Sequence, residues 1–410
     1  MAETSHHDLL ALQWPSPPRN VLVVRKDGSS RVDEALREYM DHITSTYPGV
    51  SLILEPHVAR ELHESLSFPV YSAVEEQRTF TSILQNKVDL ATTLGGDGTI
   101  LHASSLFATS RRVPPILSFS MGTLGFLGEW KFQEYKRAFR EVYMSGATAG
   151  MGSSLLETEA QYVNHGGNTA TTTAENNAQT LSGWSSVRGK SMGSSRSSRI
   201  LLRNRLKVGI YAPDGTHIPH QDPSDPESAK SDTTSNDVYA MNEVLLHRGR
   251  TPHLSVISIF VGGRFLTEAV ADGMLVSTPT GSTAYSLSAG GSIVHPLVSS
   301  LLLTPISPRS LSFRPLVLPA NTPITLRLSE SNRSQEVEVS IDGVLRSRGL
   351  EKGMEVRVVG EGIRTNAREW TGGVPSVVRA GGAGGIEGED HWVGGLNGLL
   401  KFNYPFGEDG

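Results

Sequence analysis

The first 145 residues alternate between short apolar runs and segments with helical spacing. Apolar runs typical of buried strands occupy 20–24, 50–54, 88–94 and 115–119. Apolar residues three or four apart predict a helix from Ser30, its expected N-cap, to residue 43. A second amphipathic helix is predicted over 132–144. Strands alternating with helices predict a Rossmann-like α/β domain with a parallel sheet over 20–145.

The second half of the chain has the pattern of an all-β domain. Segments 200–212, 238–246 and 254–268 read as strands, with a hairpin turn at Gly262-Gly263. Shorter strand patterns follow at 316–318, 324–328, 337–341 and 354–359. We expect a sandwich-like all-β domain over 200–375.

The remaining segments lack a sustained core pattern. We expect a flexible arm at 1–19, a disordered Ser/Thr/Gly-rich insertion at 146–199 and a polar loop at 213–236. A Gly-rich linker with a C-terminal helix is expected over 376–410. Its apolar residues are spaced to dock back on the first domain: Trp392, Leu396, Leu399, Leu400 and Phe402.

Composition excludes several kinds of chemistry. The 410 residues contain no cysteine, which excludes disulfides, a thiolate nucleophile, cysteine zinc sites and Fe–S clusters. The formal net charge of −5 gives no reason to expect nucleic-acid binding. No apolar run reaches the roughly 18 residues that span a membrane, so no membrane partner is expected. The first residues lack the basic region of a targeting sequence.

A glycine-rich turn follows the predicted strand at 88–94. Gly95-Gly96-Asp97-Gly98-Thr99 leads into a helical pattern, which allows backbone N–H groups to approach phosphate oxygens. Beside a polyphosphate, the Asp97 carboxylate could accept a proton from an attacking hydroxyl or hold Mg²⁺. The structural alternative is a tight turn in which Asp97 caps the helix.

A longer motif occupies 271–291. It places Asp272 before a strand, hydroxyls at Thr280, Ser282 and Thr283 at a helix start, and an aromatic ring at Tyr285. Small residues in this stretch would let a flat ring lie against the backbone. These are the requirements of a nucleobase pocket, and a capped helix in a β domain is the structural alternative.

Both motifs carry a family resemblance. The Gly-Gly-Asp-Gly turn resembles one shared by NAD kinases, diacylglycerol and sphingosine kinases, and phosphofructokinases. The 271–291 stretch is similar to the substrate-binding motif of NAD kinases, and the chain most resembles the fungal mitochondrial NADH kinase branch of that family.

Four further segments are similar to NAD kinases. The loop 121–127 would place Phe126 against a ring, unless Phe126 is a core residue. Asn242 and Glu243 would bind ribose hydroxyls, unless they lie solvated in a strand. His253 would lie in the pocket, unless it is structural. Asp342-Gly343 resembles a family turn, which a simple hairpin explains as well.

The resemblance implies ATP-dependent phosphorylation of the 2′-hydroxyl of the adenosine ribose of NAD or NADH. It implies Asp97 as general base, Mg²⁺ entering with ATP, a homo-oligomer, and the mitochondrial matrix, with the cytoplasm as alternative. The implied ATP-phosphate residues are Gly95, Gly96, Gly98 and Thr99. The implied NAD-binding residues are Asp97, Gly98, Phe126, Asn242, Glu243, His253, Asp272, Thr280, Thr283, Ala284, Tyr285, Ser286, Leu287 and Ser288.

Two other functions remain open from the sequence. A lipid or sugar kinase could share the Gly-Gly-Asp-Gly turn alone, although the 271–291 stretch disfavours it. A dinucleotide-binding sensor could retain the pocket without turnover, although the presence of Asp97 disfavours that reading.

Overall fold

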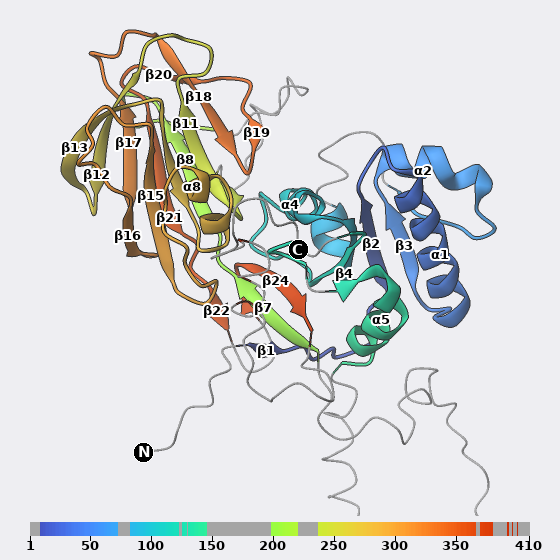
Figure 1. Ribbon diagram of the computed structural model, residues 1–410. Helices are drawn as coiled ribbons and strands as arrows, with labels where there is room; N and C mark the ends of the chain where they lie inside the picture. The colour runs from blue at the N-terminus through green and yellow to red at the C-terminus, as the bar shows by residue number, and fades with distance from the viewer. Residues whose placement is uncertain are drawn as a thin grey trace, which may run out of the picture.

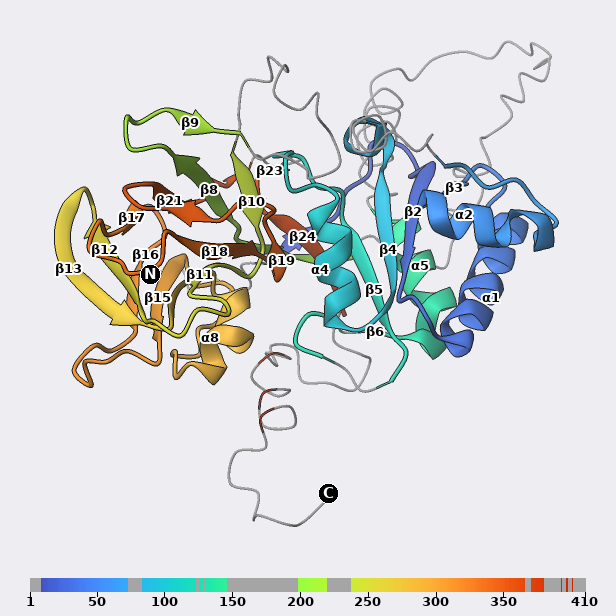
Figure 2. The same cartoon turned by 90° about the horizontal axis from the view of Figure 1, so that it is seen from above.

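Two domains lie side by side in the computed structural model (Figure 1). The structure describes residues 9–72, 83–122, 125–128, 130–145, 198–219, 237–365 and 370–379, with Trp392, Leu396 and Leu400. Helices α4 (Asp97–Ser105) and α8 (Tyr285–Ser288) lie on the sides of the two domains that face each other (Figures 1 and 2). No helix among these residues is long and apolar enough to cross a membrane.

The first domain is built on a mainly parallel sheet, which confirms the prediction. The strands follow the order β1 (Leu10–Ala11), β7 (Arg199–Arg203), β24 (Val374–Val378), β5 (Ile116–Ser120), β4 (Leu90–Gly95), β2 (Asn20–Arg25), β3 (Ser51–Leu54), with β6 (Trp130–Lys131) beside β5. Strands β3, β2, β4 and β5 are parallel, and the order reverses between β2 and β4. Ligands of such sheets bind beyond the carboxyl ends of the strands at that reversal. The Gly95–Thr99 turn lies at this point.

Helices cover this sheet. They are α1 (Ser30–Thr46), α2 (Pro56–Leu62), α4 and α5 (Tyr135–Tyr143), with short 3-10 turns η1 (His63–Ser65) and η2 (Phe132–Glu134). The apolar stripe predicted from Ser30 is buried at Leu36, Met40 and Ile43. The N-cap is Ser29 rather than Ser30, because the carbonyl of Ser29 already accepts hydrogen bonds from the first turn.

The second domain consists of antiparallel sheets, again as predicted. One has the order β10 (Val238–Ala240), β8 (Leu206–Tyr211), β21 (Glu355–Gly360), β17 (Ile324–Leu328), β12 (Ser255–Val261), β13 (Arg264–Ala271), with β9 (His217–Ile218) on β8. The other has the order β16 (Leu316–Pro319), β15 (Ser300–Ile306), β14 (Gly273–Ser277), β11 (Glu243–His247), β18 (Glu336–Ile341), β19 (Val344–Leu345), with β20 (Leu350–Glu351) on β18. Strands β22 (Arg364–Thr365) and β23 (Trp370–Thr371) pair separately.

Side chains from both of these sheets form one apolar core. Val244 and Leu246 of β11 pack with Ile257 of β12 and Val356 of β21. The β12–β13 turn at Gly262-Gly263 has φ of +58° and +77°, as a tight hairpin requires.

The domain boundaries differ from those predicted. Strands β7 and β24 belong to the first sheet, although the pattern placed 200–375 wholly in the second domain. The chain crosses into the second domain after β7 and returns before β24. Arg205 and Glu361 stand at these two crossings and form a buried ion pair, with Nε–Oε2 2.8 Å. The Arg205 guanidinium also donates to the Phe107 carbonyl of the first domain at 3.2 Å, so one side chain joins the domains.

The terminal segments also differ from expectation where they are described. Within the predicted arm, β1 pairs with β7 and Leu12 is 1% exposed in the core. Of the predicted C-terminal helix the structure describes Trp392, Leu396 and Leu400, and the Trp392 ring contacts His295 of the second domain. The rest of that predicted helix lies outside the described residues. Most of the predicted insertion at 146–199 and of the loop at 213–236 lies outside the described residues.

Candidate active site

The turn after β4 combines one tightly packed glycine with two open ones. A Cβ at Gly95 would lie 2.1 Å from Thr99 Oγ1, so the strand end tolerates no side chain. Gly96 and Gly98 are exposed, and a Cβ at either would meet nothing within 4 Å. Their backbone is therefore accessible to a ligand at the start of α4. This is the arrangement expected of a phosphate-binding turn.

The Asp97 carboxylate is anchored to a loop rather than to its own helix. Its Oδ2 accepts the Phe126 N–H at 2.9 Å and its Oδ1 accepts the Leu127 N–H at 3.1 Å. The N-cap of α4 is Gly96, so the alternative in which Asp97 caps the helix is wrong. Each oxygen keeps a second lone pair for a proton or a cation.

A second carboxylate organises the start of β11. Asp342 Oδ2 accepts the Met241 N–H at 2.7 Å, and Oδ1 accepts the N–H groups of Asn242 at 2.6 Å and Glu243 at 3.1 Å. Asp342 adopts φ +48° in the two-residue turn between β18 and β19. The Asn242–Glu243 pair is thus held from its backbone, which leaves both side chains for other partners.

Those side chains are buried and incompletely bonded. Asn242 Oδ1 and Glu243 Oε2 have no hydrogen-bond partner among the described residues. Burial, followed by the charge of Asp342, raises the pKa of Glu243 to about 7. Burial likewise raises the pKa of Asp342, against the effect of its three N–H donors. Unpaired buried polar atoms are costly, so a ligand that donates hydrogen bonds would stabilise this pair.

The hydroxyl-rich stretch is packed directly against this pair. Thr278 Oγ1 donates to the Met241 carbonyl at 2.6 Å and accepts the Gly281 N–H at 3.0 Å. A Cβ at Gly281 would lie 2.2 Å from the Asn242 carbonyl oxygen, so only glycine allows this approach. The 3-10 turn η4 (Thr280–Thr283) and α8 follow, and Thr280 is buried.

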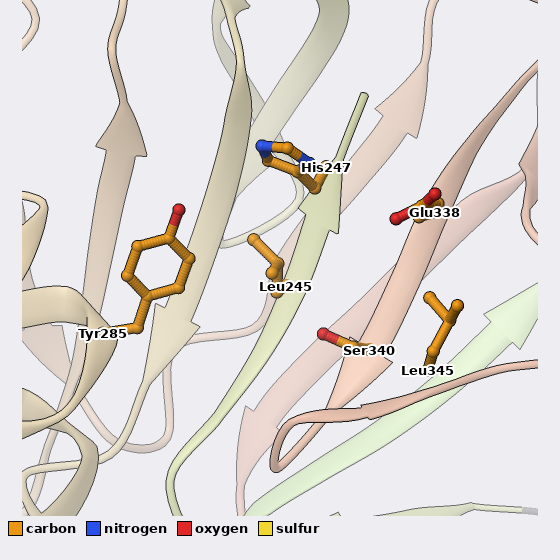
Figure 3. A pocket seen from close by; sticks show the side chains of 6 residues that line it. All are labelled: Leu245, His247, Tyr285, Glu338, Ser340 and Leu345. Carbon is orange, nitrogen blue, oxygen red and sulfur yellow. The ribbon is translucent and has the colours of Figure 1, made fainter. Parts of the chain in front are cut away.

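A pocket opens beside Tyr285 on the face of the β11 sheet that is turned away from the core. Its volume is about 260 Å³, and its lining residues are Leu245, His247, Tyr285, Glu338, Ser340 and Leu345. Figure 3 shows the Tyr285 ring on one side and Glu338 with Leu345 on the other, with β11 side chains between them. Tyr285 is 39% exposed, so its ring is accessible from the pocket.

The remaining residues that were predicted to bind NAD lie outside the pocket lining. Asp272, between β13 and β14, pairs with Arg248, with Oδ1–Nε 2.5 Å. Ser286 of α8 is buried, and its hydroxyl bonds to Thr304 Oγ1 of β15 at 2.9 Å, which ties the helix to the sheet. His253 is exposed in the loop after β11 and does not line the pocket. Thr283, Ala284, Leu287 and Ser288 lie at the surface of η4 and α8, partly or fully exposed.

Sequence reasoning missed three contributors to this geometry. Asp342 was predicted only as part of a family-like or simple hairpin turn, and its hydrogen bonds to the backbone of residues 241–243 had no signal in the sequence. Gly125 lies against Asp97, and a Cβ there would be 2.2 Å from Oδ1. Glu338 lines the Tyr285 pocket, and an exposed acidic residue on an alternating strand carries no signal of its own.

Comparisons with known proteins find similar domains and relatives along most of the chain. Residues 21–147 match the family model of the ATP-NAD kinase N-terminal domain, and residues 241–360 match that of the C-terminal domain. The mitochondrial NADH kinase of Schizosaccharomyces pombe is 36% identical over 404 residues, covering 98% of this chain and 80% of that protein. The mitochondrial NADH kinase of Saccharomyces cerevisiae is 34% identical, covering 97% and 84%.

A solved structure of an NADH kinase also matches this chain over nearly its whole length. The crystal structure of yeast NADH kinase complexed with NADH matches with a TM-score of 0.72 at 32% identity, covering 99% of this chain and 94% of that chain. Fold and site together define a kinase with an α/β domain and a β domain. The chain belongs to the ATP-NAD kinase family.

Proposed function

We propose that this kinase transfers the γ-phosphoryl group of ATP to the 2′-hydroxyl of the adenosine ribose of NAD or NADH. The ribose oxygen attacks the γ-phosphorus, the bond to the β,γ-bridging oxygen breaks, and ADP leaves. The products are NADP or NADPH. Family membership and the NADH kinases named above support this reaction.

The observation that carries the proposal is the unsatisfied pair at the start of β11. Asn242 Oδ1 and Glu243 Oε2 are acceptors, and a ribose offers hydroxyl donors in adjacent positions. Asp342 fixes the backbone of both residues, so they would meet the substrate without reorganising. Thr280, Thr283, Ala284 and Tyr285 would line the nucleoside pockets beside them, and Phe126 would close the opposite side.

Asp97 is proposed to accept the proton of the attacking 2′-hydroxyl. The Phe126 and Leu127 N–H groups hold its carboxylate in one orientation, which is what a positioned base requires. The open backbone at Gly96 and Gly98, with Thr99, would bind ATP phosphates. In-line positioning and charge neutralisation would supply most of the rate acceleration.

Mg²⁺ would enter with ATP and neutralise phosphate charge. Mg²⁺ bound with a nucleotide is held mainly by phosphate oxygens and water. The free lone pairs of the Asp97 carboxylate are the nearest candidates for a protein contact.

The direct test is a kinase assay with Mg·ATP and, in parallel, NAD, NADH or diacylglycerol. We expect NADP or NADPH and no phosphatidic acid. Phosphorylation of the lipid alone would replace the proposal with a lipid kinase. Tight NAD binding without ADP release would indicate a dinucleotide sensor.

Location and assembly are proposed on the same basis. The two mitochondrial NADH kinases support a mitochondrial location, which fractionation of cells would test. A homo-oligomer is proposed from the family resemblance. Exposed Phe265 and Leu266 on β13 offer apolar surface for it, and light scattering would test it.

A further inference from the structure

A buried arginine lies behind the loop that holds Asp97. Arg203, the last residue of β7, is 2% exposed. Its Nε donates to Ser376 Oγ of β24 at 3.0 Å, and its Nη2 donates to the Leu127 carbonyl at 3.4 Å. Strand β24 lies between β7 and β5 in the sheet, with β7 at its side (Figure 1). The guanidinium therefore reaches across β24 to the loop that follows β5.

Leu127 is thereby held by both of its backbone polar groups. Its N–H donates to Asp97 Oδ1 at 3.1 Å, while its carbonyl accepts the hydrogen bond from Arg203. The neighbouring Phe126 N–H donates to Asp97 Oδ2 at 2.9 Å. A loop with one anchor can pivot about it, whereas a second anchor on the opposite side fixes its position. A shift of the loop relative to Arg203 would therefore turn the Asp97 carboxylate.

Packing alone does not explain an arginine at this position. Val374 is the register partner of Arg203, so the two side chains share one face of the sheet. Val374 belongs to an apolar cluster that also contains Ile100, Leu127 and Met241. Burying a guanidinium in such surroundings costs free energy, which a leucine or methionine of similar reach would not. The charged group therefore indicates that its hydrogen-bond donors are needed.

We propose that Arg203 is a positioning residue for phosphoryl transfer: it holds the loop 125–128, and the loop orients the Asp97 carboxylate. Its guanidinium acts through the Leu127 carbonyl rather than by touching substrate. The inference rests on the proposed function, because it assigns a support to the proposed base. The ribose-binding pair at the start of β11 is held separately by Asp342, so loss of Arg203 should affect turnover more than binding.

Steady-state kinetics of Arg203→Met test this role, because methionine keeps apolar bulk and removes every donor. We expect kcat to fall about tenfold to a hundredfold, as a displacement of about 1 Å at a reacting group allows, with KM for NAD(H) nearly unchanged. Arg203→Lys keeps one charged donor and should recover part of the lost kcat. An unchanged kcat in Arg203→Met would overturn the proposal.

Val377→Ala is the matched control for lost stability. Val377 lies in the same strand pair, opposite Ile200, but packs in the core on the other face of the sheet. Its truncation should lower the melting temperature and leave kcat unchanged. Equal losses of kcat in Val377→Ala and Arg203→Met would show that Arg203 has only a structural role.

Ser376→Ala makes the same test if Arg203→Met does not fold. It removes the acceptor of Arg203 Nε and leaves the charge and both strands in place. We expect kcat to fall about two- to tenfold, the range that loss of one hydrogen bond allows, again with KM nearly unchanged. A normal kcat in Ser376→Ala would count against the role of Arg203.

A double-mutant cycle tests whether Arg203 acts through Asp97. In the Asp97→Asn background, Arg203→Met should lower kcat much less than it does in the wild type, because the group that it orients has lost its function. Losses that multiply in full would show that Arg203 acts on another part of the enzyme and would overturn the proposal.

Amide hydrogen exchange without substrate separates this inference from the proposed function. The Phe126 and Leu127 N–H groups should exchange about two- to tenfold faster in Arg203→Met, because their loop has lost one hydrogen bond. Unchanged exchange beside an inactive Asp97→Asn would overturn the role of Arg203 and leave the proposed base in place. Faster exchange beside a nearly normal kcat of Asp97→Asn would contradict the proposed base, yet support the hold of Arg203 on the loop.

Discussion

Asp97 and Gly125 are in such close contact that the site has no room for one more carbon between them. A Cβ on Gly125 would lie 2.2 Å from Asp97 Oδ1 and 2.6 Å from Oδ2. The next two residues of the same loop donate their N–H groups to those oxygens. The glycine therefore sets how near the loop comes to the proposed base.

Replacing Gly125 with alanine should displace either the loop or the carboxylate. A shift of about 1 Å at a reacting group can lower the rate about 10²-fold, so we expect kcat of Gly125→Ala to fall by that order. Gly122→Ala is the matched control, since a Cβ there meets nothing within 4 Å. Steady-state kinetics of both variants provide the test. Equal kcat values for both would show that Gly125 does not set the distance between the loop and Asp97.

Asp97→Asn tests the proposed base itself. The amide keeps the shape of the carboxylate but cannot accept the ribose proton, and one of its ends becomes a donor facing a backbone N–H. We expect kcat to fall about 10²- to 10⁴-fold, with a smaller change in the KM for NAD(H). Calorimetry should show that the variant still binds the dinucleotide. A variant with nearly normal kcat would exclude Asp97 as the base.

The sequence predicted the class of each domain but not how the chain divides between them. The apolar run at 200–212 predicts β7, but no strand was predicted at β24. The two strands are more than 170 residues apart, and among the described residues they pair only with each other and with first-domain strands. Local pattern carries no information about such pairing. Ser286 is a similar case. Its hydroxyl could bind a ligand, but in the structure it forms a hydrogen bond with Thr304, 18 residues further along the chain.

The Asn242–Glu243 pair also depends on a long-range contact that the local sequence does not predict. Its residues were predicted from resemblance, whereas the reason for their rigidity lies about 100 residues away at Asp342. Motifs therefore predict which residues form the site, and long-range hydrogen bonds explain how those residues are held.

Asp342→Asn should weaken the hold on the backbone of Asn242 and Glu243 without disturbing the turn between β18 and β19. Asparagine tolerates the positive φ of this position, but its NH₂ group cannot accept one of the three N–H donors. Losing a hydrogen bond to a charged group costs about 1.5–3 kcal/mol, so we expect KM for NAD(H) to rise about tenfold or more while KM for ATP stays constant. Asp214→Asn, at an exposed turn where the carboxylate accepts one N–H at 2.8 Å, should change neither value. A parallel rise in both KM values would point to general destabilisation.

Arg205→Ala should destabilise the junction between the domains. Its guanidinium bonds to Glu361, Phe107 and Ser110, and it lies 4.4 Å from the centre of the Tyr239 ring. Removing one partner of a buried pair typically costs about 3–5 kcal/mol, because the other charge stays buried. Arg327→Ala removes a half-exposed arginine whose partner Glu355 keeps a second ion pair with Arg357, so it should cost no more than about 1 kcal/mol. Thermal unfolding measures both, and similar melting temperatures would contradict the expected difference.

The buried carboxyl of Glu243 should make stability depend on pH. Its pKa is about 7 in the folded protein, against an ordinary 4.5, so folding favours the protonated form. The stability linked to that proton is complete below pH 4.5 and is lost as pH rises to 7, a change of about 3 kcal/mol. Glu243→Gln mimics the protonated form, so its melting temperature should approach that of the wild type near pH 5 and exceed it increasingly toward pH 8. Melting curves measured across that range provide the test, and a constant offset between the two proteins would show that Glu243 does not titrate in this window.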